Sequence, residues 1–187
     1  MKHRFRNICY DADRLLKDVS DLKSFMRNLE RQAKEDHAMS WTADEYKGMA
    51  FEALIEVLIS ASPIDKRINI TDYRPHDSRV DGRDMGIDGF GRSHNGNHHT
   101  VQIKYRIDPN AVLTTKDSIS NFVAKTMSHP DYRDADMTIF TTAKDLHQII
   151  AEDMYHGRVR TVSRRDLAKL VDNNPAFWNR FRSEMGV

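Results

Sequence analysis

In Asp84-Met-Gly-Ile-Asp-Gly-Phe-Gly91 and Thr100-Val-Gln-Ile-Lys-Tyr-Arg106, the β-branched and aromatic residues predict two short strands. The polar run His94-Asn-Gly-Asn-His-His99 lies between them and contains Asn95-Gly96, a strong signal for a two-residue turn. The sequence therefore predicts a hairpin in the middle of the chain, and the rest of the fold is expected to build on it.

Three polar side chains are expected to meet at one edge of this hairpin. Asp88 falls on the first strand, and Gln102 and Lys104 are two residues apart on the second, so these two side chains share a face. One interpretation is that Gln102 and Lys104 form the solvent face of an amphipathic edge strand. The other is a metal site, in which Asp88 binds a hard divalent cation and Lys104 lies beside the water that the cation activates.

The order of the motifs resembles the PD-(D/E)XK nuclease superfamily over about residues 42–172. In this pattern Glu52 lies on a helix, Asp88 on a strand, and Gln102-Ile-Lys104 on the next strand. Gln102 takes the place of the usual Asp or Glu, which resembles the Mrr-type branch and the nuclease domains attached to some phage and restriction helicases. The stretches that carry the resemblance are Gly48-Met-Ala-Phe-Glu52, Gly86-Ile-Asp-Gly89, Val101-Gln-Ile-Lys-Tyr105, Thr115-Lys-Asp-Ser-Ile119 and Thr138-Ile-Phe-Thr-Thr142.

Strands and helices alternate in the second half of the chain, which predicts an α/β fold around a mixed central sheet. The resemblance implies the restriction-endonuclease-like core, with helices on both faces of that sheet. We expect a helical extension over residues 1–40 and a nuclease domain over residues 41–187.

The resemblance also implies a Mg²⁺-dependent DNA endonuclease, with Mn²⁺ as a possible substitute. Asp88 would bind the metal directly, beside the Ile103 backbone carbonyl and the Gln102 side-chain oxygen. Glu52 would hold the metal directly or through water, and Lys104 would orient the water and stabilise charge. Because Gln102 is neutral, the site has one anion fewer than the Asp/Glu version, which is expected to weaken metal affinity.

Other groups near these motifs are weaker candidates. Glu56 lies one helical turn after Glu52, and Asp84 is the reserve metal ligand if Asp88 faces away. The cluster His94, His98 and His99 invites a zinc hypothesis. A hairpin tip is a poor metal cage, however, and an ordinary polar turn or a DNA-contacting turn is favoured there.

Charge is distributed unevenly although the net charge is only +1. Residues 1–35 carry nine Lys/Arg against six Asp/Glu and residues 156–187 carry seven against three, so the middle of the chain is acidic at −6. Basic flanks around an acidic centre suit a metal site held against a phosphate backbone, although solvated helix faces give the same counts. The residues that we expect to contact DNA are Arg106, Lys116, Arg164 and Arg165.

The composition excludes several other classes of protein. Cys9 is the single cysteine, so neither an intramolecular disulfide nor a thiol-rich zinc site is expected. The sequence has no apolar run of membrane-spanning length and no secretion signal, which predicts an intracellular protein, cytoplasmic or phage-encoded in the host cytoplasm.

Periodicity and capping signals predict the other elements. The predicted strands cover 67–73, 136–142 and 159–162. The predicted helices are an amphipathic helix over 11–36, a helix from the Thr42-Ala-Asp-Glu45 capping box to Ser60, and helices over 143–154, 164–171 and 175–185. A further helix is capped near 114–117, with the apolar stripe Ile119, Phe122, Val123 and Met127 facing inward. The first helix is expected to pack on its own domain, with a dimer contact or a DNA-gripping arm as alternatives.

Two other functions remain open from the sequence. One is a non-catalytic DNA-binding or assembly module on the same fold. The other is a nuclease subunit that works only with a helicase or another partner, which would be a separate chain because this one has no P-loop. Cutting both strands of a duplex would favour a symmetric homodimer.

Overall fold

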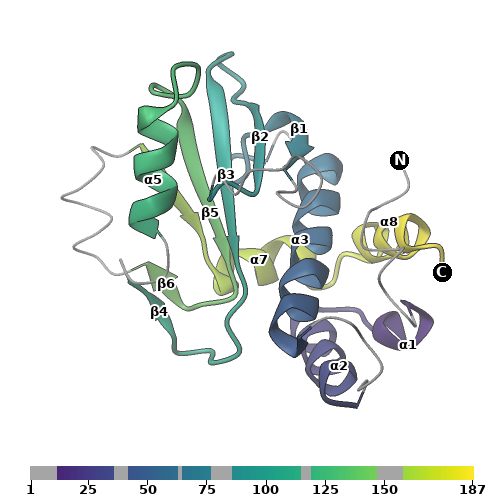
Figure 1. Ribbon diagram of the computed structural model, residues 1–187. Coiled ribbons are helices and arrows are strands. Elements are labelled where there is room, and N and C mark those ends of the chain that lie inside the picture. Colours follow the sequence, from purple (N-terminus) through teal and green to yellow (C-terminus); the bar gives the residue numbers. More distant parts are fainter. Residues whose placement is uncertain (1–11, 36–41, 63–64, 77–85, 115–118, 147–157) are drawn as a thin grey trace. The chain divides into compact units, whose positions relative to one another are not determined.

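The computed structural model describes residues 12–35, 42–62, 65–76, 86–114, 119–146 and 158–187. The described residues form two compact units (Figure 1). One unit combines the residues up to Ala61 with Asp166–Val187, and the other is Ser62–Arg165. None of the helices in the described ranges has the length and apolarity needed to cross a bilayer. Because residues 36–41 fall outside these ranges, the boundary expected at residue 40 stays a prediction.

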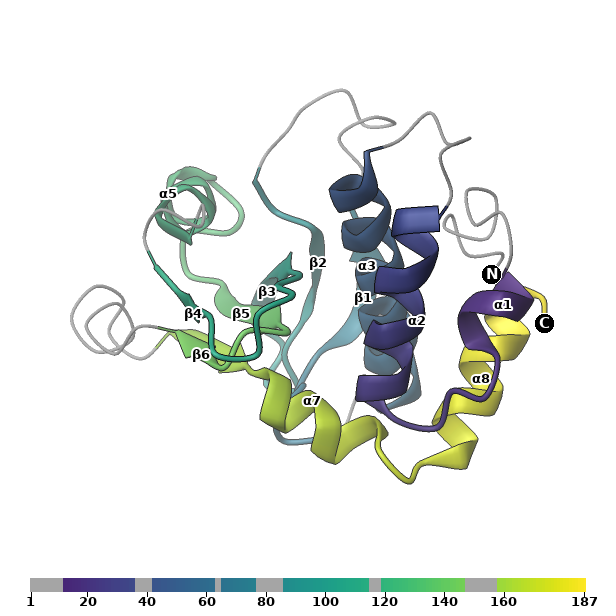
Figure 2. The same cartoon turned by 90° about the horizontal axis from the view of Figure 1, so that it is seen from below.

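The first unit is helical, and its helices pack in pairs. Both views show α2 beside α3 and α1 beside α8 (Figures 1 and 2). Phe25 of α2 contacts Trp178 and Phe181 of α8, with ring centroids 6.1 and 5.9 Å apart, so aromatic side chains fill this core. The helices are α1 (Ala12–Leu16), α2 (Leu22–Glu35), α3 (Ala43–Ala61), α8 (Pro175–Met185) and α7 (Arg164–Val171), which begins in the second unit.

The single helix predicted over residues 11–36 is wrong, because the described chain forms two helices there. Asp18 adopts a left-handed backbone (φ 56°) between α1 and α2. The Asn28 side-chain amide donates to the carbonyls of Leu15 and Lys17 at 3.0 and 2.9 Å, which satisfies the end of α1. Asp21 then caps α2 by accepting a hydrogen bond from the Ser24 backbone N–H at 2.7 Å.

The capping box predicted at the start of α3 is present. The Glu45 backbone N–H donates to Thr42 Oγ1 at 3.2 Å and the Thr42 N–H donates to Glu45 Oε2 at 2.8 Å, which confirms the capping box. Asn174 caps α8 by accepting from the Phe177 N–H, and Gly186 ends that helix with φ 82°. Both α7 and α8 have the predicted bounds.

The second unit is built on a mixed five-stranded sheet in the order β1-β2-β3-β5-β7. The β1–β2 and β2–β3 pairs are antiparallel, and the β3–β5 and β5–β7 pairs are parallel, so the predicted α/β class with a mixed sheet is confirmed. The strands are β1 (Thr71–Pro75), β2 (Gly89–Arg92), β3 (His98–Lys104), β5 (Asp136–Thr141) and β7 (Val159–Val162), with a small second sheet of β4 (Val112–Leu113) and β6 (Asp145–Leu146).

The helix α5 (Ile119–Ser128) covers one face of this sheet (Figure 1). Its buried side chains join a cluster with Met137 and Ile139 of β5. Met127 was predicted to face inward, but it is 44% exposed, and Thr126 is buried in its place. Thr126 reaches the sheet through a 3.1 Å hydrogen bond between its hydroxyl and that of Thr100.

Two further predictions need correction, and a third falls outside the described residues. The strand expected over 67–73 lies at Thr71–Pro75, and Asn69 has a positive φ angle just before it. Within the strand Asp72 also has a positive φ, where the pairing with β2 is irregular between Thr71 and Arg74. The helix expected over 143–154 is not present where the chain is described, since Asp145–Leu146 form β6; residues 147–157 lie outside the described part. Residues 115–117 of the predicted N-cap also lie outside it.

The hairpin turn is longer than the two residues predicted. The Ser93 N–H donates to the Asn97 carbonyl at 2.9 Å, and the Gly96 N–H donates to the Ser93 carbonyl at 2.8 Å. Gly96 has a φ of 86°, which matches a three-residue loop that ends in a left-handed glycine. The Asn95-Gly96 signal therefore marked the turn correctly but not its length.

We expect Gly91→Ala to lower the free energy of unfolding by about 1–3 kcal/mol. A Cβ atom at this position would lie 2.7 Å from Ile70 Cγ2 and 2.8 Å from the Thr71 carbonyl oxygen, so β1 would have to move. Gly48→Ala on α3 is the control, because nothing lies within 4 Å of its added Cβ and alanine favours a helix over glycine. Urea unfolding that ranks Gly91→Ala as stable as Gly48→Ala would contradict this packing.

Candidate active site

Asp88 is fixed between two strands of the sheet. It lies directly before β2, and its backbone N–H donates to the Val101 carbonyl at 2.8 Å. Its own carbonyl accepts from the His76 N–H at 2.9 Å. Because both backbone groups are used in this way, the Asp88 side chain is presented at a defined place beside β3.

The Asp88 carboxylate contacts Gln102. The sequence predicted that Asp88, Gln102 and Lys104 would meet, and this contact joins two of the three. Asp88 Oδ2 accepts a hydrogen bond from the Gln102 side-chain amide and a second one from the Ile103 backbone N–H at 2.5 Å. The carboxylate thus continues the hydrogen bonding between β2 and β3 past the end of β2. Two donors hold one of its oxygens, which restricts the rotation of the side chain.

Gln102 is buried, with 1% of its surface exposed. Its Oε1 atom has no hydrogen-bond partner among the described residues. A buried amide oxygen without a partner costs roughly 1–3 kcal/mol, so a donor or a cation at this position would be stabilising. The burial also shows that the interpretation of Gln102 as part of a solvent-facing edge strand is wrong, because β3 lies in the middle of the sheet.

Lys104 ends β3 on the same face as Gln102 and is half-buried. The Lys104 carbonyl accepts hydrogen bonds from the Thr141 hydroxyl at 2.8 Å and from the Thr142 N–H at 3.3 Å, which fixes its backbone. In the described part of the chain, no hydrogen bond or ion pair involves the Lys104 ammonium group. The Lys104 backbone is therefore fixed, and its ammonium group can act on a group from outside the chain.

Basic residues predicted to contact DNA lie at the same end of the parallel strands. Arg106 follows β3, where its N–H donates to the Thr142 hydroxyl at 2.6 Å. Arg164 follows β7, its N–H donates to the Ala143 carbonyl at 3.0 Å, and its buried Nη1 has no hydrogen-bond partner among the described residues. Arg165 is exposed, whereas Lys116 lies outside the described ranges.

Glu52 lies on α3 in the helical unit, directly after the buried Phe51, and is half-buried. The other predicted site residues belong to the sheet unit. Glu56 lies one turn further along the same helix, and Asp84 is outside the described residues. The participation of Glu52 in the site therefore stays a prediction.

Side-chain clusters that could bind a metal without help from other groups are absent from the described residues, where no three His, Cys, Asp or Glu come together. The three histidines of the hairpin do not converge, because His98 and His99 alternate on opposite faces of β3 and His94 is exposed in the turn. His99 is instead buried, bonded to the Ser93 hydroxyl at 2.9 Å and to the Thr138 hydroxyl at 2.8 Å.

Sequence reasoning missed a pocket of about 260 Å³ on the sheet unit. Phe90 and Arg92 line it, and both lie on one face of β2, so strand alternation could have indicated them. Tyr132 also lines it from the turn after α5, where no periodic pattern marks a surface side chain.

The mixed five-stranded sheet defines an α/β domain, and comparison with known families assigns its class. The family model Mrr_cat_2, described as a restriction endonuclease, matches residues 59–184. The chain therefore belongs to this restriction endonuclease family and has the restriction-endonuclease-like fold that the motifs predicted. Asp88, Gln102 and Lys104 fall inside the matched range, and Glu52 precedes it. Comparison with curated proteins and with solved structures gave no match.

Proposed function

We propose that this protein is a Mg²⁺-dependent DNA endonuclease that hydrolyses phosphodiester bonds at Asp88, Gln102 and Lys104, with Glu52 as a further metal ligand. The observation that supports it most is the contact between the Asp88 carboxylate and the buried Gln102, whose Oε1 has no partner in the described part of the chain. Membership of a restriction endonuclease family makes DNA the expected substrate.

The oxygen groups at this place suit a hard cation. The Asp88 carboxylate, Gln102 Oε1 and the Ile103 carbonyl are the ligand types that Mg²⁺ prefers, and Mg²⁺ accepts a few protein ligands while keeping several waters. Glu52 would add a second carboxylate, and Mn²⁺ is expected to substitute. When bound, the metal would activate a water molecule and neutralise charge on the phosphate.

The residues of the chain contribute position and charge. The two hydrogen bonds to Asp88 Oδ2 hold this carboxylate before any ligand arrives, which avoids a cost of ordering it during the reaction. The Lys104 ammonium would orient the attacking water and stabilise the negative charge that develops on the phosphate. Arg106, Lys116, Arg164 and Arg165 are proposed to bind the DNA backbone, since guanidinium groups pair well with phosphate.

A cleavage assay tests this function. Purified protein would be incubated with supercoiled plasmid, single-stranded DNA and a branched junction, each with Mg²⁺, Mn²⁺ or EDTA. We expect cleavage with either metal and none in EDTA. Metal-independent DNA binding without cleavage of any substrate would instead support a non-catalytic module, or a nuclease that needs a helicase, a second copy of itself or another partner.

Gln102→Glu should make the stability of the protein depend on Mg²⁺. Without metal, the new carboxylate would face the Asp88 carboxylate, and Asp88 Oδ2 would lose the hydrogen bond that the Gln102 amide donates to it. The free energy of unfolding should therefore fall by roughly 1–3 kcal/mol. With Mg²⁺ bound between two carboxylates, the loss should be reversed and less metal should be needed for half-maximal cleavage.

Thermal unfolding with and without Mg²⁺ measures this effect. Gln32→Glu is a matched control, because Gln32 is also buried (2% exposed) but accepts a hydrogen bond from the Tyr46 hydroxyl at 2.8 Å in the helical unit. Its loss of stability should not respond to Mg²⁺. An equal response of both variants would argue against a metal at Gln102.

A further inference from the structure

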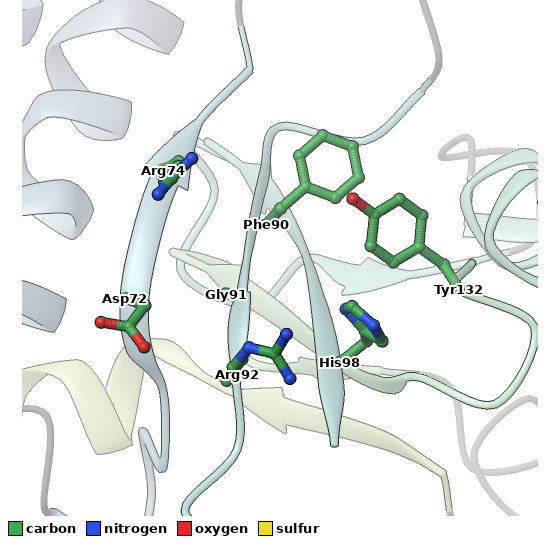
Figure 3. Close-up of a pocket in the computed structure, with 7 residues that line it drawn as sticks. All are labelled: Asp72, Arg74, Phe90, Gly91, Arg92, His98 and Tyr132. Carbon is green, nitrogen blue, oxygen red and sulfur yellow. The ribbon is translucent and has the colours of Figure 1, made fainter. Parts of the chain in front are cut away.

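A pocket of about 260 Å³ lies on the sheet unit, and none of its lining residues belongs to the proposed catalytic group (Figure 3). This volume lies below the usual range for drug-sized ligands, roughly 300–1,000 Å³, and suits one small planar group. The pocket is open to the surface and is lined by Asp72, Arg74, Phe90, Gly91, Arg92, His98 and Tyr132.

One wall of the pocket is aromatic. The rings of Phe90 and Tyr132 are stacked with centroids 4.7 Å apart, and His98 meets Tyr132 edge-on at 5.3 Å. Figure 3 shows the Phe90 and Tyr132 rings side by side, with His98 next to them. His129 also contacts Tyr132 at 4.6 Å and His76 meets Phe90 edge-on at 5.7 Å. Both rings are nevertheless only partly buried, so they keep some apolar surface that a planar ligand could cover.

The aromatic wall is held in place by its backbone. The Tyr132 N–H donates to the His129 carbonyl at 3.1 Å, and the Ala135 N–H donates to the Tyr132 carbonyl at 2.9 Å. The Arg158 side chain then donates to the Ala135 carbonyl at 3.1 Å. Tyr132 is thus fixed in a hydrogen-bonded turn, and little conformational freedom would be lost when a ligand binds against it.

The other wall carries positive charge. Arg74 and Arg92 are exposed, and Asp72 is the one carboxylate among the lining residues. Arg92 uses Nη1 to donate to the Gly96 carbonyl at 3.0 Å, which leaves other N–H groups of the guanidinium for a ligand. Aromatic rings beside guanidinium groups are the combination that binds a base and its phosphate.

The pocket is placed where a DNA strand at the catalytic group could reach it. Phe90 and Arg92 follow Asp88 by two and four residues, and strand alternation puts the Phe90 and Arg92 side chains on one face of β2. At about 3.3 Å per residue, these positions are roughly 7 and 13 Å from Asp88 along the strand. Such a separation corresponds to one or a few nucleotides of an extended strand.

We propose that this pocket binds an unpaired DNA base, with the base against Phe90 and Tyr132 and its phosphate between Arg74 and Arg92. The identification of the ligand as DNA rests on the proposed function. A base inside a duplex is stacked and cannot enter such a pocket unless it is extruded. The enzyme should therefore prefer DNA that exposes unpaired bases next to the cleaved bond, such as single strands, junctions or flipped nucleotides.

Binding without cleavage tests the proposal. A fluorescent thymidine oligonucleotide and an abasic oligonucleotide of the same length, which keeps every phosphate, would be titrated with the full-length protein in EDTA. We expect the thymidine probe to bind roughly tenfold more tightly, because stacking of a base on an aromatic side chain is sequence-tolerant and strong. Equal affinity for the two probes would overturn the proposal and leave a site for phosphate alone.

Variants assign the difference to the pocket. Tyr132→Leu should weaken thymidine binding to the level of the abasic probe, while Tyr132→Phe should keep the tenfold difference. Arg92→Gln should weaken the binding of both probes. Arg133→Gln is the control, because Arg133 is an exposed arginine in the turn of Tyr132 that does not line the pocket, and it should weaken binding less. If Tyr132→Leu folds, as circular dichroism would show, and keeps the difference, the base binds elsewhere and the proposal is wrong.

The result is independent of cleavage. If the protein discriminates the two probes through Tyr132 but cuts no DNA with metal, the base-binding pocket is supported and the proposed endonuclease function is wrong. If the protein cuts DNA but binds both probes equally, the endonuclease function is supported and the base-binding pocket is wrong.

Discussion

Lys104→Ala is expected to lower the rate of DNA cleavage by roughly a hundredfold to a thousandfold, the range seen when one charge-stabilising group is removed from an active site. The Lys104 ammonium has no ion-pair partner in the described part of the chain, so its removal orphans no other charge there. Its backbone stays fixed by Thr141 and Thr142, which do not depend on the side chain. Single-turnover cleavage of plasmid DNA with Mg²⁺ measures the loss, and thermal unfolding should show a nearly unchanged midpoint.

Asp88 should be equally important for cleavage but more important for structure. Asp88→Ala removes the acceptor of the Ile103 N–H and the Gln102 amide, so it should abolish cleavage and also cost roughly 1–3 kcal/mol of stability. Asp88→Asn keeps an oxygen that can accept the Ile103 N–H, while it removes the negative charge. It should therefore lose cleavage with a smaller loss of stability, which separates the chemical role from the structural one.

The control for these variants is Lys144→Ala, which removes an exposed lysine after the neighbouring strand β5. It should cut DNA at close to the wild-type rate. Wild-type cleavage by Lys104→Ala or by Asp88→Asn would show that the proposed site does not carry the reaction.

The sequence predicted those parts of the fold that depend on local chemistry. The Thr42–Glu45 capping box and the proline at the start of α8 act within one helical turn, so their patterns are visible in the chain. The break between α1 and α2 was missed because the apolar spacing continues through it. Asn28 stabilises this break through contacts that spacing does not show, because its side chain reaches back to carbonyls 13 and 11 residues earlier.

In the site, too, local patterns were predicted and contacts between distant segments were not. The shared face of Gln102 and Lys104 follows from strand periodicity, and the structure shows Asp88 in contact with Gln102. The second hydrogen bond of Asp88, to the Ile103 N–H, depends on the register of β2 against β3 and could not be read from spacing. The burial of Gln102 likewise depends on the parallel pairing of β3 with β5, a contact between segments more than thirty residues apart.

A second large effect is expected from His99, which should make the protein less stable in acid. Burial lowers the pKa of His99 to about 4, with nearby Asp136 opposing the shift and Arg160 adding to it. The imidazole is 1% exposed and bonds to the hydroxyls of Ser93 and Thr138. Since the Ser93 hydroxyl also bonds to Asp136 Oδ2 at 2.5 Å, the network is complete with His99 neutral.

The direction of the effect follows from proton binding. In the unfolded chain His99 should have a pKa near 6.5, so between pH 6.5 and pH 4 the unfolded state binds more protons than the native state. The stabilisation is fully present above pH 6.5 and is lost as the pH falls towards 4. The loss amounts to about 3 kcal/mol, at about 1.4 kcal/mol per pKa unit.

Urea unfolding of the wild type and of His99→Gln across this pH range measures the effect. The wild type should lose about 3 kcal/mol more than the variant between pH 6.5 and pH 4, because glutamine can hydrogen-bond to both hydroxyls but does not titrate. Groups that titrate in both proteins cancel in the difference. His94→Gln, which changes an exposed histidine of the same hairpin, should keep the wild-type slope. If His99→Gln keeps it as well, the acid sensitivity arises elsewhere, and His99 is not held neutral in the native protein.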